Sequence, residues 1–214
     1  MRFSLSISFL ILFLSLKINA QDNDGWVFKN EKEGVKVYYK STSDIQEVKL
    51  ISSIQSTMSG LIQLFSEVEN YPKWGYKIIE SRLLKKVSDT ESYYYSKIDF
   101  PWPMNDRDII MHSITVQDPV TRCITAVSVA VPDYIPVNKD VIRIRTANTK
   151  WTIYPGAGGW LYTEYYIHSD PGGTIPEWLV NLAIDMGPRE TIKGIRNALK
   201  QNRYQQVKLG YIKE

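Results

Sequence analysis

The stretch His168-Ser169-Asp170-Pro171-Gly172-Gly173-Thr174-Ile175-Pro176-Glu177-Trp178-Leu179-Val180-Asn181 decides how this chain folds. It joins a strand-like segment, through a glycine-rich turn, to a hydrophobic helix. Thr174 and Glu177 have the spacing of a capping box, in which each side chain satisfies a backbone N–H left open at a helix start. Pro176, in the first turn, loses no intrahelical hydrogen bond. The sequence therefore predicts a capped helix that begins at this turn.

The predicted helix is apolar over most of its circumference. One side carries apolar residues at helical spacing, and further apolar residues widen that surface beyond an ordinary stripe: Ile175, Trp178, Leu179, Leu182 and Met186, then Val180, Ala183 and Ile184. Gly187-Pro188 is expected to interrupt the helix, and Ile192, Ile195 and Leu199 indicate that it resumes. Such a helix needs apolar cover, either from a thick core or from a bound apolar ligand.

The preceding sequence reads as strands with one inserted helix. Met58, Leu61, Ile62, Phe65 and Val68 are spaced by three or four residues and predict a capped helix over Thr57–Glu69. β-Branched and aromatic residues with turn signals between them predict strands at 35–40, 47–54, 78–87, 91–100, 107–116, 122–131, 141–154 and 160–169. We therefore expect an α+β fold, with a curved antiparallel sheet around the long C-terminal helix and an internal hydrophobic cavity.

The first twenty residues have the features of a secretory signal peptide. The apolar run Phe3–Leu16 follows Arg2 and is shorter than the roughly 20 residues that a membrane-spanning helix needs. Ala20 provides the small residue expected at a cleavage point. The single Cys123 cannot form an intramolecular disulfide. We expect residues 21–214 to form one exported domain, with its core at about 26–200, in the periplasm or at the cell surface of a bacterium.

Charge and residue types exclude several classes of function. Removing the first twenty residues takes away two basic residues and no acid, which leaves basic and acidic residues nearly in balance and offers no case for nucleic acid. Two histidines, His112 and His168, lie far apart, and no histidine is near Cys123. Gly156-Ala157-Gly158-Gly159 joins two strands and reads as a hairpin turn, not a phosphate loop. We expect no catalytic residue, no metal, no cofactor and a monomer.

Three tracts stand in a fixed order and spacing: Phe100-Pro101-Trp102-Pro103-Met104-Asn105-Asp106-Arg107-Asp108-Ile109-Ile110, then Val141-Ile142-Arg143, then Asp170 to Asn181. Together they resemble the START family of lipid-transfer domains, most closely its phosphatidylcholine-transfer-protein branch, over about residues 26–199. The resemblance implies a helix-grip fold, in which a curved antiparallel sheet grips a C-terminal helix over a lipid-sized tunnel. It also implies that one lipid or other apolar molecule is bound and carried without chemistry, with transient membrane contact.

The resemblance and the strand alternation together suggest the site residues. Those expected to face the cavity are Tyr94, Ser96, Ile98, Ile109, Met111, Ser113, Arg145, Ala147 and Thr149, with Trp178 and Leu182 from the helix. Arg145 is the one cation of the set and is expected to contact the polar end of the ligand. The gate is expected in the helix and in the loop 132–140, and its residues are Tyr134, Ile135, Pro136, Gly172, Gly173 and Gly187.

The positions that recognise phosphatidylcholine in the family are not kept. The residues of the choline cage fall on Ser96, Ile109 and Ala147, and the phosphate-binding arginine falls on Pro72. A cation needs aromatic faces and a phosphate needs donors, and none of these side chains supplies them. The inward arginine of sterol-carrying members falls on Ser113. The ligand stays open among other lipids, sterol-like molecules and apolar metabolites.

Two alternative functions make different structural predictions. A helix-grip enzyme of cyclase or hydrolase type would need polar side chains that converge in the cavity, and Tyr94, His112, Arg145 and Glu164 are the candidates. A secreted protein-interaction module would have a filled interior and an exposed apolar patch.

Overall fold

The chain folds around one ten-stranded sheet in the computed structural model, which describes residues 25–41 and 46–214, without the side chains of residues 46, 177 and 180–185. The strands are β1 (Val27–Lys32), β2 (Val35–Ser41), β3 (Gln46–Gln55), β4 (Ile78–Lys86), β5 (Glu91–Ile98), β6 (Arg107–Gln117), β7 (Ile124–Ala130), β8 (Ile142–Arg143), β9 (Thr146–Pro155) and β10 (Trp160–Asp170). The strand order is β1-β2-β3-β10-β9-β7-β6-β5-β4, and all neighbours along it are antiparallel. This confirms the predicted antiparallel sheet.

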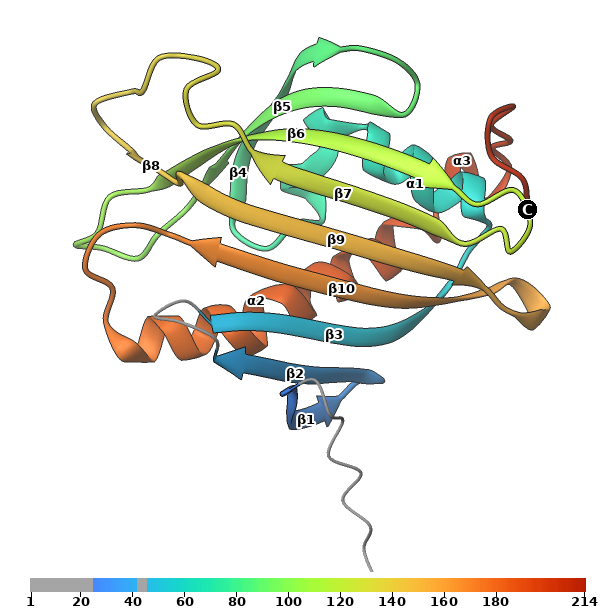
Figure 1. Ribbon diagram of the computed structural model, residues 1–214, viewed down its shortest axis with the longest axis horizontal. Coiled ribbons are helices and arrows are strands. Elements are labelled where there is room, and N and C mark those ends of the chain that lie inside the picture. The colour runs from blue at the N-terminus through green and yellow to red at the C-terminus, as the bar shows by residue number, and fades with distance from the viewer. Residues whose placement is uncertain (1–24, 42–45) are drawn as a thin grey trace, which may run out of the picture.

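The helices are α1 (Met58–Ser66), η1 (Val68–Lys73), η2 (Ala157–Gly159), α2 (Glu177–Ala198) and α3 (Asn202–Gln205). Figure 1 shows α2 running behind the sheet, with α1 and α3 near the far end of α2. We call the face of the sheet toward α1 and α2 the inner face and the opposite face the outer face. All eight predicted strands are confirmed, although the segment predicted at 141–154 is divided into β8 and β9.

The strand β1 was missed by the sequence reasoning. Neither face of β1 is buried, so its sequence lacks the alternation that marks a half-buried strand. It pairs with β2 through an irregular register between Phe28 and Asn30. The predicted helix over Thr57–Glu69 is confirmed in its first part and is shorter than expected, because the chain passes from α1 into the 3₁₀ helix η1 after Glu67.

The start of α1 shows why a helix forms there. The hydroxyl of Thr57 accepts from the N–H of Gly60, and the carbonyl of Thr57 accepts from the N–H of Leu61. The carboxylate of Glu214, far along the chain, accepts from the N–H groups of Met58 and Ser59 at 2.7 and 2.9 Å. The N–H groups of Met58, Ser59 and Gly60, which a helix leaves open in its first turn, therefore all have side-chain acceptors.

The helix α2 differs from its prediction at both its start and its middle. Pro176 is the N-cap, with extended backbone angles, so the helix begins at Glu177 and Thr174 is not the N-cap that the predicted capping box requires. The reason lies in the preceding turn, where Gly172 and Gly173 both have positive φ and the helical conformation is not reached before Pro176. The predicted interruption at Gly187-Pro188 is also wrong, since α2 continues through both residues.

The core occupies only part of the inner face. Its main cluster joins α1 and the second half of α2 to β2, β3, β7, β9 and β10: Val37, Leu50, Ile54, Leu61, Ile124, Ile153, Ile192 and Ile195 are nearly or fully inaccessible members. A second, small cluster of Met111, Ile144 and Ala147 lies on the side of β6 and β9. The inner face of β4, β5 and β6 is left to face α1, η1 and a cavity.

The predicted signal peptide, residues 1–20, lies outside the described residues. Among the helices that the structure describes, none is both long enough and apolar enough to cross a membrane.

Candidate functional site

A cavity of about 490 Å³ lies between the inner face of the sheet and the segment formed by α1 and η1. Its walls come from β4, β5, β6, β7, β9 and β10 on the sheet side, from α1 and η1 on the opposite side, and from Thr191 of α2. This volume falls within the range of about 300–1,000 Å³ that small-molecule sites occupy. The interior is therefore not filled by side chains. A secreted protein-interaction module is expected to have a filled interior, so this cavity does not match that alternative.

Aromatic rings from the sheet side and from the helical side meet and form a continuous aromatic wall of the cavity. The rings of Trp151 and Tyr165, adjacent on β9 and β10, are stacked with their centroids 4.1 Å apart. Phe65 of α1 packs against Trp151 at 5.2 Å, and Tyr71 of η1 meets Tyr94 of β5 edge-on at 5.4 Å. Such surfaces are large, stiff and apolar, and they suit an apolar ligand.

The phenols in this wall are held in their neutral form. Burial raises the pKa of Tyr71, Tyr94 and Tyr165 above the usual value of 10.0. The hydroxyl of Ser128 acts on Tyr94 in the opposite direction and limits its shift. The Tyr71 hydroxyl donates to the carbonyl of Phe65, which fixes η1 against α1. The cavity thus carries polar groups without carrying charge in its aromatic wall.

Charged side chains reach the cavity only at one end among the described lining residues. They are Lys86, Asp89 and Glu91, at the turn between β4 and β5. Lys86 pairs with Asp89 at 2.7 Å, with both side chains mostly exposed, and a carboxylate oxygen of Glu91 lies 2.8 Å from Nε2 of His112. The segment that follows α3 completes this end of the cavity with Leu209 and Tyr211.

Seven of the eleven residues predicted to face the cavity do line it: Tyr94, Ser96, Ile98, Ile109, Met111, Ser113 and Thr149. Ala147 is buried beside the cavity in the small cluster with Met111 and Ile144. Trp178 is 56% exposed, because α2 begins later than predicted and its first turn lies at the rim of the molecule. The side chain of Leu182 lies outside the described residues.

Arg145 does not face the cavity. The chain leaves the strand conformation between Arg143 and Thr146, and this break turns Arg145 outward, where its Nη2 lies 2.9 Å from a carboxylate oxygen of Asp133. The side chain of Arg145 is 59% exposed. Strand alternation counted across the break places it inside, so the prediction that Arg145 faces the cavity is wrong.

None of the six predicted gate residues, all of which are described, lines the cavity. The ring of Tyr134 stacks on Tyr93, on the outer face, at 4.7 Å. Ile135 and Pro136 offer their carbonyls to the buried guanidinium of Arg143.

A second buried arginine, Arg107, donates to the carbonyls of Pro171 and Gly172 in the turn before α2, at 3.2 and 3.0 Å. Both Gly172 and Gly173 have positive φ, and Gly187 is buried inside α2.

The four candidates for an enzymatic centre do not converge. Tyr94 lines the cavity, whereas His112 stacks on Tyr93, and Glu164 lies beside Lys150 and Tyr166 in a shallow groove of the outer face. Among the described residues no group of histidine, cysteine, aspartate and glutamate side chains could hold a metal ion.

The sequence reasoning missed the helical side of the cavity. Phe65, Tyr71 and Trp74 lie there, and the sequence reasoning assigned no cavity role to the predicted helix Thr57–Glu69 or to the turn that follows it. Alternation along strands cannot identify these residues. Their one available signal was an aromatic pair, Tyr71 and Trp74, in a short polar turn.

Comparisons with known proteins agree with this architecture. The model of the START domain family matches residues 14–205. An uncharacterized protein of Pseudomonas aeruginosa is 31% identical over 180 residues, which are 83% of this chain and 88% of that protein. Phosphatidylcholine transfer protein of Rattus norvegicus is 23% identical over 180 residues, or 81% of this chain and 83% of that one.

Two solved structures have the same fold. The STAR-related lipid transfer protein of Xanthomonas axonopodis, solved as a fragment, superposes with a TM-score of 0.76 at 32% identity and covers 83% of this chain and 100% of that one. Human STARD10 superposes with a TM-score of 0.72 at 20% identity, covering 84% of this chain and 74% of that one.

Proposed function

This chain belongs to the START domain family, and on that premise we propose that it binds a single lipid or other apolar small molecule in its cavity and carries it. The cavity of about 490 Å³ beneath α1 and η1 is the observation that carries the proposal. Each methylene buried there contributes roughly 0.8 kcal/mol, so about ten of them approach the 8 kcal/mol of a micromolar complex. Binding of this kind requires no catalytic group.

Extraction of the purified protein tests this function. The folded chain, isolated from a bacterial host, is extracted with organic solvent, and the extract is analysed by mass spectrometry beside that of an unrelated protein handled in the same way. One apolar compound at close to one molecule per chain is the expected result. An empty extract, together with no uptake from a panel of lipids and hydrocarbons, would contradict the proposal.

The gate is proposed in the first half of α2 and in the loop 132–140. Support comes from the way in which the second half of α2 is held. Arg189 donates to the carbonyls of Lys32 and Val35, and Arg196 donates to the carbonyls of Glu33 and Ser53. Both anchors lie beyond Pro188, so a movement about Gly187-Pro188 would leave them in place. Hydrogen exchange across residues 175–199 is expected to slow when ligand binds, and equal rates in both states would remove the support for this gate.

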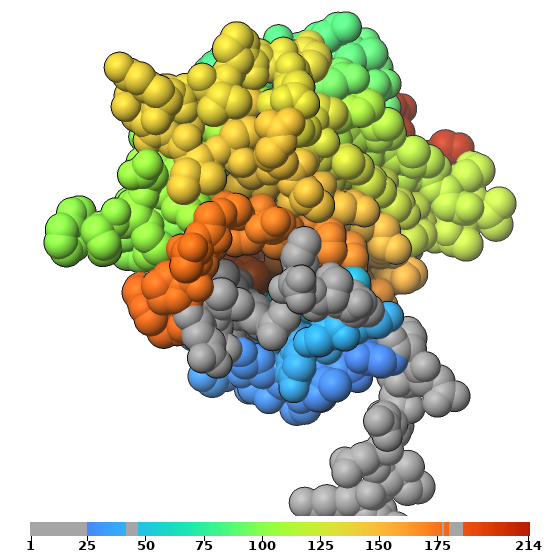
Figure 2. Space-filling view, turned by 60° about the vertical axis from the view of Figure 1, so that its left-hand side comes forward, coloured from blue at the N-terminus to red at the C-terminus, as the bar shows by residue number. Residues whose placement is uncertain are grey.

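Transient contact with a membrane is proposed at the end of the molecule where α2 begins. Figure 2 looks onto this end, where the segments 99–106, 131–141 and 171–176 are all found. Large apolar side chains project from it, with Trp102 92%, Val137 52% and Trp178 56% exposed. Tryptophan is favoured at the level of lipid headgroups. Co-sedimentation with phospholipid vesicles is expected to fall in a Trp102→Ala, Trp178→Ala double variant and to stay unchanged in Trp160→Ala, which lies at the opposite end.

Export is proposed from the features of residues 1–20. Fractionation of a bacterial host that expresses the whole chain, with the N-terminus of the exported product sequenced, tests it. A product that begins near Gln21 outside the cytoplasm is expected, and retention of the uncut chain inside would contradict it.

A further inference from the structure

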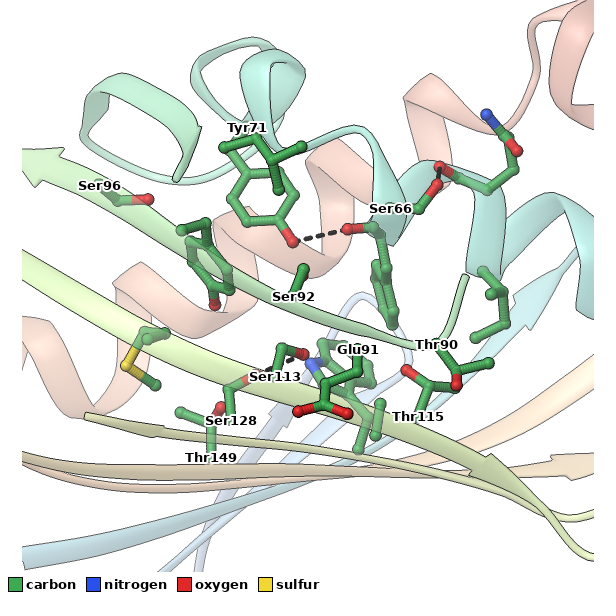
Figure 3. Close-up of a pocket in the computed structure, with 18 of the residues that line it drawn as sticks. Ser66, Tyr71, Thr90, Glu91, Ser92, Ser96, Ser113, Thr115, Ser128 and Thr149 are labelled. Atoms are coloured by element: carbon green, nitrogen blue, oxygen red, sulfur yellow. Dashed lines mark hydrogen bonds between the residues drawn. The ribbon is translucent and has the colours of Figure 1, made fainter. Parts of the chain in front are cut away.

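A row of hydroxyl side chains crosses four strands of the cavity floor in register. Ser92 of β5 is paired with Ser113 of β6, and Ser113 with Ser128 of β7. Ser128 is in turn paired with Thr149 of β9. All four residues line the cavity, and Figure 3 shows them following one another across the sheet. Because directly opposite residues lie about 4.5–5.5 Å apart between Cβ atoms, the row forms a continuous band, which we call the hydroxyl band.

The hydroxyl band lies between two zones that are mainly apolar. The neighbouring pair toward one end is Tyr94 with Met111. The neighbouring row toward the other end is Thr115, Ala126, Trp151 and Tyr165, in which Thr115 adds one hydroxyl to three mainly apolar side chains. A ligand that fills the cavity would therefore meet mainly apolar walls on both sides of a central polar strip.

The band has unused hydrogen-bonding capacity. The Ser128 hydroxyl donates to Ser113 Oγ at 3.0 Å, which leaves the Ser113 proton free to be donated. Ser92 Oγ and Thr149 Oγ1, both in the described part of the chain, have no protein partner within hydrogen-bond distance. A hydroxyl both donates and accepts, so the band can serve a ligand alcohol or a ligand carbonyl.

The band offers nothing to a charged group. The charged side chains of the described cavity lining, Lys86, Asp89 and Glu91, stand at the β4–β5 end. A carboxylate or phosphate placed on the band would lose its water without gaining a cation, which is costly. The cavity of about 490 Å³ lies in the lower half of the range of about 300–1,000 Å³ that small-molecule sites occupy. This size suits a single chain or a fused-ring body better than a phospholipid with two acyl chains.

We propose that the ligand is an uncharged molecule of single-chain or fused-ring size with a hydroxyl or carbonyl oxygen inside an otherwise apolar body. This oxygen hydrogen-bonds to the band at Ser113, Ser128 and Thr149. The inference rests on the proposed function and adds the chemical class of the ligand to it.

Competition against pyrene, a fluorescent hydrocarbon without oxygen, tests the class. The full chain is loaded with pyrene and titrated with pentadecanol whose hydroxyl is on the central carbon and with pentadecanoate. The alcohol is expected to displace pyrene at a concentration at least about tenfold below that of pentadecanoate. In a separate arm the chain is incubated with phosphatidylcholine vesicles, separated from them and extracted, and no bound phosphatidylcholine is expected. Displacement by pentadecanoate at an equal or lower concentration, or phosphatidylcholine recovered at close to one molecule per chain, would overturn the inference.

Two variants test the residues. Thr149→Val and Ser128→Ala each remove one hydroxyl from the band. Each is expected to lower the affinity for the alcohol by about three- to tenfold while leaving the affinity for pyrene unchanged. Thr125→Val removes a hydroxyl from the outer face of β7 and is expected to change neither affinity. Unchanged alcohol affinity in both band variants, with their folds intact, would overturn the inference even if pyrene still binds. Failure of the wild-type chain to bind pyrene or any competitor would overturn the proposed function as well.

Discussion

Arg143 and Asp108 form a two-pronged ion pair that is almost completely enclosed. Nε and Nη2 of Arg143 lie 2.7 and 2.8 Å from the two carboxylate oxygens of Asp108, and the side chains are 3% and 1% exposed. The two residues are brought together by the parallel pairing of β8 with the start of β6. The same guanidinium donates to the carbonyls of Pro132, Ile135 and Pro136, so one cation fixes the loop 132–136 to the sheet.

Replacing Arg143 by alanine is expected to lower the free energy of unfolding by about 3–5 kcal/mol, because it leaves a buried carboxylate without its partner. The measurement is urea denaturation followed by circular dichroism. Arg145→Ala is the matched control, since its pair with Asp133 is exposed and is worth less than about 1 kcal/mol. Equal losses in the two variants would show that the enclosed pair does not hold the loop.

Gly194 allows α2 to touch the chain between η1 and β4. A Cβ at this position would lie 2.1 Å from the carbonyl oxygen of Trp74. Gly194→Ala is expected to destabilise the fold by about 1–3 kcal/mol through overpacking, despite the better helix propensity of alanine. Gly210→Ala, where a Cβ meets open space, is the control for thermal unfolding. A stable Gly194→Ala protein would mean that α2 can shift away from Trp74.

The buried tyrosines of the cavity make the stability of the fold depend on pH in the alkaline range. Burial, aided by the neighbouring Tyr94, raises the pKa of Tyr165. Its phenol would ionise near the usual value of 10.0 in the unfolded chain and at a higher pH in the folded one. The folded state therefore keeps a proton that the unfolded state loses, and stability must fall as pH rises above about 10.

Tyr165→Phe is expected to make that fall shallower by the contribution of one proton. The measurement is urea denaturation at a series of pH values, with tyrosinate absorbance recorded in parallel. If the folded wild-type chain ionised all its tyrosines together near pH 10, the raised pKa would be contradicted.

Glu214 stabilises a helix that begins at Met58. Its carboxylate accepts two N–H groups at the positive end of the α1 dipole. Glu214→Gln is expected to cost about 0.5–2 kcal/mol of stability, in the range of other lost N-terminal caps. Glu190→Gln, which breaks an exposed pair with Lys193 on α2, serves as the comparison in the same denaturation series. No difference between the two would leave the capping role without support.

Most of the fold could be predicted from the sequence because half-buried strands and amphipathic helices leave periodic patterns. The failures occur where the backbone departs from a regular element. The turn at Gly172 and Gly173 delays the start of α2, and the break before Thr146 turns the side chain of Arg145 from the inner face to the outside. Neither event has a periodic signal.

The cavity could be predicted on its sheet side only. Tyr94, Met111 and Thr149 follow from strand alternation. The opposite wall depends on how η1 folds back over the sheet, and the hydrogen bond from Tyr71 to Phe65 that helps to fix it carries no sequence pattern.

The pairing of β3 with β10 has a consequence for the order of folding. Ser52 and Thr163 share a hydrogen bond of 2.7 Å across 111 positions of sequence, and β1 and β2 join the rest of the sheet only through β3. The first three strands therefore cannot take their place until the last strand has been synthesised. Contacts between such distant positions slow folding, because the chain must close a long loop before the pairing stabilises it. Until then the edge of β3 that later pairs with β10 has no partner, and the newly made chain exposes an open sheet edge.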